Sequence, residues 1–164
     1  QVKELKAEIE KLKAGAPARP SAQHVKAVAR LRAYCSAQCM FKRNDWDQNM
    51  TLEYSPDLKV LSNQLDGNGT PIRLVPGAMD AAVGATGKPW DGYLFKDMAS
   101  IATVKIDWIN DYACCATPAK YGGETRLTFI VCTNGTVFCK DLGKSQFVLD
   151  YPANPAADGW KIAE

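Results

Sequence analysis

The chain has 164 residues, of which 46% are hydrophobic and 23% charged, and its formal net charge is +2. This length and composition are typical of one soluble globular domain. The near-neutral charge gives no reason to expect nucleic acid or an anionic membrane as a partner. No apolar run approaches the ~18 residues that span a bilayer. The alternative that a signal peptide or membrane anchor was removed upstream of Gln1 stays open.

Six cysteines are an even and high count for this length. They are Cys35, Cys39, Cys114, Cys115, Cys132 and Cys139. With one histidine and no C-x-x-C, the zinc-finger, haem-attachment and thioredoxin patterns are missing. We therefore expect disulfides and an exported protein. The alternative is that the cysteines are buried and reduced and act as small hydrophobic side chains.

The first thirteen residues show a heptad pattern. Its a and d positions are Val2, Leu5, Ile9 and Leu12. Glu8 at g and Lys13 at the following e favour a parallel, two-stranded coiled coil that joins one copy to another. Two heptads are too short to associate strongly in isolation, so the segment would have to continue upstream or be held within an assembly. The alternative is a single amphipathic helix lying on its own domain or on a neighbour.

Residues 14–20 interrupt this pattern, because Gly15, Pro17 and Pro20 break a helix and leave a short, fairly stiff connector. We therefore divide the chain into a helical assembly segment with its linker, residues 1–20, and a head domain, residues 21–164.

A second helix is predicted from about Ser21, which can cap it, to about Lys42. The residues predicted to form its apolar face are Val25, Val28, Leu31 or the stem of Arg32, Cys35 and Cys39. Cys35 and Cys39 are one turn apart, which places their Cα atoms at the outer edge of what a disulfide spans. We expect each to bond to the strand segment and so to staple the helix to a sheet.

Strands are predicted at 93–97, 112–117, 126–132 and 136–140, the last two joined by a turn centred on Asn134-Gly135. This turn would place Cys132 and Cys139 on the same face of the sheet. Adjacent Cys114 and Cys115 must point to opposite faces, so at most one can reach a covering helix. The fold expected is α+β, with the N-terminal helix packed on a small antiparallel sheet.

Residues 43–92 are irregular, with a short helix predicted near 56–65, and Phe147 to Glu164 is expected to wrap the sheet as an extended tail. In the loop 66–71, Asp66, Asn68 and Thr70 place oxygen atoms on alternate residues, as calcium-binding loops do. The loop lacks the glutamate at position 12 of an EF-hand, and a plain turn is the alternative.

No catalytic motif is present, and we expect neither catalysis nor a cofactor other than this possible calcium ion. The single histidine, His24, is predicted to be a solvated surface residue. Tryptophans 46, 90, 108 and 160 would line a ligand cleft or, more commonly, pack in a core or interface. Asn49, Asn68 and Asn134 lie in glycosylation sequons, which plain turn chemistry also explains.

Three blocks of the chain follow a pattern found in one bacterial group. In the helix the matching residues are Ala27, Leu31-Arg32 and Ala37-Gln38, and in the second block they are Gly92-Tyr93 and Phe95-Lys96. In the third block, residues 112–143, they are Thr117 to Gly122, Thr128 to Val131, Gly135, Val137 and Lys140 to Gly143. The chain resembles an exported family of unknown function related to type IV pilins and type II secretion pseudopilins. The resemblance implies a helix packed on an antiparallel sheet and an extracytoplasmic location. Pilins polymerise through a hydrophobic N-terminal helix, whereas here charged heptads stand in that place.

We therefore expect a non-enzymatic, disulfide-stapled structural protein, outside the cell or at its surface. It would self-assemble into a filament, tube or surface layer through its N-terminal segment. One alternative is a membrane-tethered, pseudopilin-like component of a secretion or competence machine. Another is a periplasmic module that holds a small ligand or calcium with the tryptophans and the 66–71 loop.

Overall fold

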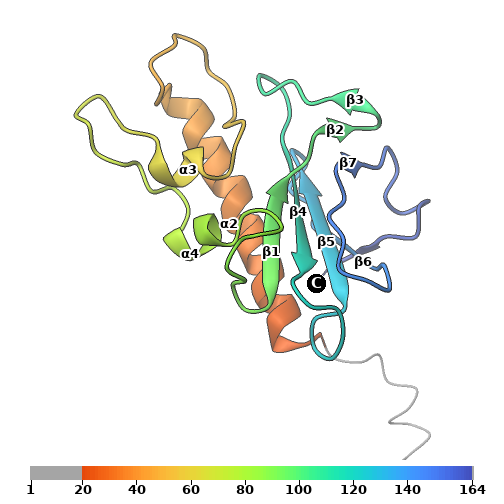
Figure 1. Ribbon diagram of the computed structural model, residues 1–164. Helices are drawn as coiled ribbons and strands as arrows, with labels where there is room; N and C mark the ends of the chain where they lie inside the picture. The colour runs from red at the N-terminus through yellow and green to blue at the C-terminus, as the bar shows by residue number, and fades with distance from the viewer. Residues whose placement is uncertain (1–19, 164) are drawn as a thin grey trace, which may run out of the picture.

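The computed structural model describes residues 20–163, in which one long helix lies along one face of an antiparallel sheet (Figure 1). This confirms the α+β class and the helix-on-sheet arrangement. The predicted assembly residues Val2, Leu5, Ile9 and Leu12 lie outside the described residues.

The long helix, α2, runs from Ala22 to Asn44 and is capped by Ser21, whose Oγ accepts a hydrogen bond from the His24 amide at 3.2 Å. Lys42 and Arg43 in its last turn oppose the negative end of the helix dipole. The chain leaves the helix at Asp45 in a left-handed conformation. The predicted span and cap are confirmed.

The buried face of α2 differs from the predicted one. It consists of Ala27, Val28, Leu31, Tyr34, Ala37, Gln38 and Phe41. Val25 and Cys39 are exposed, and Cys35 is partly buried. The stripe follows the large aromatic side chains Tyr34 and Phe41, because they bury the most apolar area against the sheet.

The main sheet has five antiparallel strands in the order β1-β4-β5-β6-β8. The strands are β1 Tyr93–Asp97, β4 Ala113–Pro118, β5 Leu127–Cys132, β6 Phe138–Asp141 and β8 Lys161–Ile162. The four predicted strands are thus present, with ends shifted by a residue or two in three of them. A second sheet, β3-β2-β7, contains Val104–Lys105, Ser100–Ile101 and Asp150–Tyr151. Two short helices, α3 Val60–Asn63 and α4 Gly77–Ala81, lie in the segment before β1, and α3 falls within the predicted short helix.

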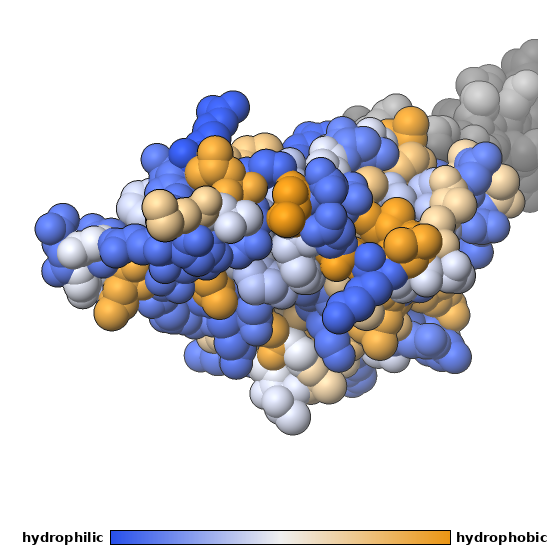
Figure 2. Space-filling model, turned by 90° about the horizontal axis from the view of Figure 1, so that it is seen from above, coloured by the Kyte–Doolittle hydropathy of each residue, from blue (hydrophilic) through white to orange (hydrophobic). Residues whose placement is uncertain are grey.

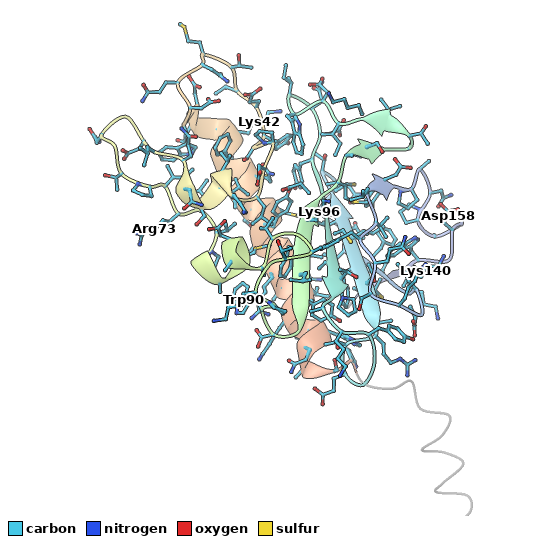
Figure 3. The ribbon with its side chains drawn as sticks, viewed as in Figure 1. Lys42, Arg73, Trp90, Lys96, Lys140 and Asp158 are labelled. Atoms are coloured by element: carbon cyan, nitrogen blue, oxygen red, sulfur yellow. The ribbon has the colours of Figure 1, made fainter. Side chains whose placement is uncertain are left out.

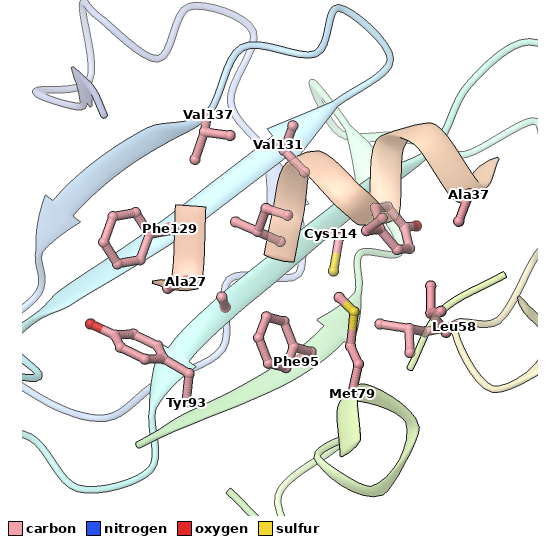
Figure 4. Packing of buried hydrophobic residues seen from close by; sticks show 14 of the residues in the cluster. Ala27, Ala37, Leu58, Met79, Tyr93, Phe95, Cys114, Phe129, Val131 and Val137 are labelled. Carbon is pink, nitrogen blue, oxygen red and sulfur yellow. The ribbon is translucent and has the colours of Figure 1, made fainter. Parts of the chain in front are cut away.

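Every residue of β4 is buried, because both faces of the main sheet are covered. On one face, side chains of α2 pack with Phe95, Cys114, Phe129 and Val131 (Figure 4). On the other face, the tail residues Tyr151 and Trp160 pack with residues from β4 and β5. The predicted wrapping of the sheet by the tail is therefore confirmed.

The turn between β5 and β6 corrects the predicted register. Gly135 N donates to Cys132 O at 2.8 Å and Gly135 has a φ of 75°, as in a three-residue hairpin loop that ends in a left-handed glycine. In this register Cys139 lies opposite Phe129. A shift of one residue flips a side chain to the other face, so the prediction that Cys132 and Cys139 share a face is wrong.

Candidate functional site

A groove lies at the end of the molecule where α2 begins. Its volume is about 700 Å³. It is lined by Pro20, Ser21, His24 and Val28; by Gly123, Glu124, Arg126, Leu127 and Phe129; and by Cys139, Lys161, Ile162 and Ala163. Helix α2, strands β5, β6 and β8, and the loop before β5 therefore all contribute to its walls.

The start of α2 is tied to the groove wall through Ser21. Its hydroxyl donates to the backbone oxygen of Glu124 at 2.6 Å while accepting from the amide of His24. Ser21 thus caps the helix and positions the loop before β5, which fixes the first turn of α2 against the sheet.

His24 forms part of the groove instead of standing in solvent as predicted. Its ring meets Phe129 edge-on, with ring centroids 5.7 Å apart, and its Nε2 is buried without a hydrogen-bond partner. Burial lowers the pKa of His24, the charge of Arg126 lowers it further, and Glu124 opposes them. At their spacing, Ser21, His24 and Val28 lie on one face of a helix, and this is the sequence signal for the position of His24. The predicted apolar face, which included Val25, missed it.

The groove contains a cysteine, but its environment does not activate the thiol. Burial raises the pKa of Cys139, and the nearby charge of Lys161 opposes this only in part. A protonated thiol is a poor nucleophile. The groove therefore combines apolar residues with a few charged groups, Glu124, Arg126 and Lys161, and its thiol is not an activated nucleophile.

The six cysteines are divided between the helix and both faces of the sheet, and in this structure none is joined in a disulfide. Cys114 packs on the helix side, whereas Cys115 and Cys132 pack on the tail side. The prediction that Cys114 and Cys115 point to opposite faces is confirmed. Large side chains such as Tyr34 are buried between α2 and the sheet. The staple from Cys35 and Cys39 to the strands stays a prediction.

The loop 66–71 forms a turn organised by its first residue. Asp66 Oδ1 accepts hydrogen bonds from the amides of Asn68 and Thr70, both at 2.9 Å. Within residues 20–163, His, Cys, Asp and Glu side chains do not gather in groups of three that could hold a metal ion. The geometry is that of the plain turn considered as the alternative to calcium.

The tryptophans are distributed over two cores. Trp46 and Trp90 pack against the helix-side core, Trp160 is buried on the tail side, and Trp108 touches both. Trp90 lies in the segment before β1 (Figure 3) and stacks with Arg30, whose guanidinium lies 3.7 Å from the ring centroid. The same guanidinium pairs with Asp91. These contacts secure α2 to the segment before β1. The three sequon asparagines, Asn49, Asn68 and Asn134, are exposed.

The fold is a helix-on-sheet α+β domain with a groove at the start of its long helix. A family model described as "Protein of unknown function (DUF2950)" matches residues 19–150, and the chain belongs to this family. Searches of curated proteins and of solved structures found no match. Among the described residues, α2 and the shorter helices are not long and apolar enough to cross a membrane.

Proposed function

We propose that the protein is a non-enzymatic, exported building block that assembles with copies of itself through its N-terminal segment. The observation that carries this proposal is the groove at the start of α2. It lies where the connector joins the head, since Pro20 is part of its wall. A groove close to the point where the assembly segment joins the head is suited to assembly.

The resemblance to pilins and pseudopilins supports the extracellular part of the proposal. The helix packed along an antiparallel sheet is the arrangement that this resemblance implies. Disulfides among the six cysteines would suit a protein exposed outside the cell, because each cross-link adds roughly 2–4 kcal/mol to the free energy of unfolding.

The test is the assembly state of the full chain as a function of its concentration. We expect oligomers or filaments by sedimentation and electron microscopy, and we expect the double substitution Leu5→Glu and Ile9→Glu to abolish them. Lys3→Glu, which changes charge outside the a and d positions, serves as the control. Monodisperse monomers at high concentration, unchanged by the double substitution, would refute the proposal.

A further inference from the structure

We infer that His24 is a pH-sensitive switch for the start of α2. When its ring takes up a proton, the ring leaves its contact with the sheet, and the first turn of the helix loosens together with the loop before β5. This inference goes beyond the proposed function and is independent of it, because it concerns the head domain whether or not copies of the chain assemble.

His24 connects the first turn of α2 to the sheet. Its ring meets Phe129 of β5 edge-on, with centroids 5.7 Å apart, and Tyr93 of β1 at 6.4 Å. Its backbone amide donates to the capping hydroxyl of Ser21, which itself donates to Glu124 O at 2.6 Å. One residue therefore links the helix cap, two strands of the sheet and the loop before β5.

The contact with the sheet suits a neutral ring and disfavours a charged one. The Nε2 atom of His24 is buried and has no hydrogen-bond partner among the described residues. A neutral imidazole has one nitrogen without a proton, whereas in an imidazolium both nitrogens are donors. A proton on Nε2 would therefore bury a charged donor beside two aromatic rings without an acceptor, which is costly.

The charges around the ring add to this effect. The titratable groups that touch the ring or line the groove with it are Tyr93 of β1, Glu124 and Arg126 of the loop before β5, Cys139 of β6 and Lys161 of β8. Burial raises the pKa of Tyr93 and that of Cys139, so both stay uncharged where histidine titrates. Burial lowers the pKa of His24, Arg126 lowers it further, and Glu124 opposes them. The positive end of the α2 dipole acts in the same direction as Arg126.

The groove gives a protonated ring a place to go. It adjoins His24, has a volume of about 700 Å³ and includes Glu124 in its lining. There an imidazolium can stay hydrated and lie near an opposite charge, both of which favour the charged form. Once the ring leaves Phe129 and Tyr93, the first turn of α2 loses its aromatic contact with the sheet.

The second half of α2 responds to pH in the opposite direction. There Tyr34 donates to Asp97 at 2.8 Å, and burial raises the pKa of Asp97 to about 6. Acidification neutralises this carboxyl group and so favours the docked helix. Figure 2 shows the molecule from the end at which α2 finishes, where hydrophobic residues are interspersed with hydrophilic ones. Because His24 is the single histidine of the chain, this end provides an internal control.

The pH window follows from the direction of the pKa change. A base whose pKa is lowered by folding contributes stability that is fully present above its ordinary pKa, here 6.5. That contribution is lost as the pH falls from there towards the pKa of the folded state. We therefore expect the first turn of α2 to loosen below pH ~6.5.

A titration of the full chain by NMR spectroscopy between pH ~4 and ~8 tests the switch. We expect the ring of His24 to titrate with a midpoint below the ordinary 6.5, and its nuclear Overhauser effects with Phe129 to disappear as it becomes charged. Amide-exchange protection factors of residues 24–28 should fall about tenfold or more between pH ~7.5 and ~5, whereas those of residues 36–41 should not fall. A midpoint of 6.5 or above, or contacts with Phe129 that persist over the whole range, would overturn the inference.

Two matched substitutions separate an effect of charge from a structural one. Arg126→Gln removes the charge that lowers the pKa of His24, whereas Glu124→Gln removes the charge that raises it. We expect the midpoint to rise by about 0.3–0.5 pH units in the first variant and to fall by about as much in the second. Glu124→Gln keeps the bond from Ser21, which goes to the backbone oxygen. Midpoints that stay unchanged, or move in the same direction in both variants, would contradict this explanation.

His24→Phe provides the last readout, because phenylalanine fills the same place with a ring that takes up no proton. This variant should keep the protection of residues 24–28 at pH ~5. If these residues lose protection as they do in the wild type, the loosening has another cause and the inference fails. Should His24→Phe not fold, the wild-type titration and the two charge variants decide the question.

Discussion

Asp97 at the end of β1 is a partly buried carboxylate held by two distant parts of the chain. Its Oδ1 accepts from the Tyr34 hydroxyl at 2.8 Å and its Oδ2 from the Leu58 amide at 2.7 Å. Gln38 extends this network by donating to the Tyr34 oxygen at 2.9 Å and to Ser55 O at 3.0 Å. The network joins α2, the segment before α3 and β1, and each buried polar group in it has a partner.

Burial raises the pKa of Asp97 to about 6, although the hydrogen bonds from Leu58 and Tyr34 oppose this. A pKa raised in the folded state favours folding at low pH, and the benefit is lost as pH rises through about 6. We therefore expect the stability of wild type relative to Asp97→Asn to fall by about 2 kcal/mol between pH ~4 and ~7. Urea unfolding of both proteins across this range measures it.

Asp158→Asn is the matched control for this experiment, because Asp158 is exposed. Its substitution should leave the pH dependence of unfolding as in the wild type. An Asp97→Asn variant whose curve runs parallel to that of the wild type would show that the carboxyl group titrates normally.

Gly87 is required by a close backbone approach. A Cβ added there would lie 2.7 Å from the carbonyl carbon of Ala82 and 2.8 Å from the oxygen of Val83. The displaced backbone is the one that pairs with Phe95 at the edge of β1. We therefore expect Gly87→Ala to lower the free energy of unfolding by about 1–3 kcal/mol, measured by urea titration.

Gly77 provides the comparison, since a Cβ there meets no atom within 4 Å. Gly77→Ala should be neutral, or more stable by up to about 1 kcal/mol because alanine has less backbone freedom to lose. Equal effects at the two positions would contradict the steric explanation.

At the scale of elements, the cap of α2 can be tested separately from its packing. Ser21→Ala removes both the acceptor for the His24 amide and the donor to Glu124 O. We expect a loss of about 1–2 kcal/mol in the free energy of unfolding. Ser36→Ala, at an exposed site where the hydroxyl donates only to Arg32 O, should change it by less than about 0.5 kcal/mol. Comparable losses would show that Ser21 does not act as a cap.

The existence of α2 and of the strands could be predicted from the sequence, because helical spacing, β-branched runs and turn residues are local signals. The sheet register could not, because Asn134-Gly135 fits a two-residue and a three-residue loop, and the choice moves Cys139 to the other face. The face of α2 was also misassigned, since which stripe is buried depends on the sheet it meets.

The candidate groove illustrates the same limit for sites. Its walls combine the first turns of α2 with Phe129 and Ile162, which are more than a hundred residues away along the chain. No local pattern relates these residues. His24 and Asp97 share this property, because their perturbed pKa values come from burial by distant segments.

For the whole molecule, the oxidation state of the cysteines decides between a disulfide-stapled head and one held together by packing alone. In the structure Cys39 is exposed, whereas Cys114 and Cys115 are fully buried. Burial raises the pKa of Cys115 to about 12 and that of Cys35 to about 11, which keeps these thiols protonated and unreactive.

Reduced native protein should therefore be alkylated first at Cys39, with the buried thiols reacting only on unfolding, as peptide mass spectrometry would show. In protein isolated from an oxidising compartment, the proposed staples would instead leave Cys39 unreactive and yield fewer than six thiols in denaturant without reductant. If all six thiols titrate there, packing of α2 against the sheet stabilises the head without cross-links. In that case the cysteines would no longer be an argument for export.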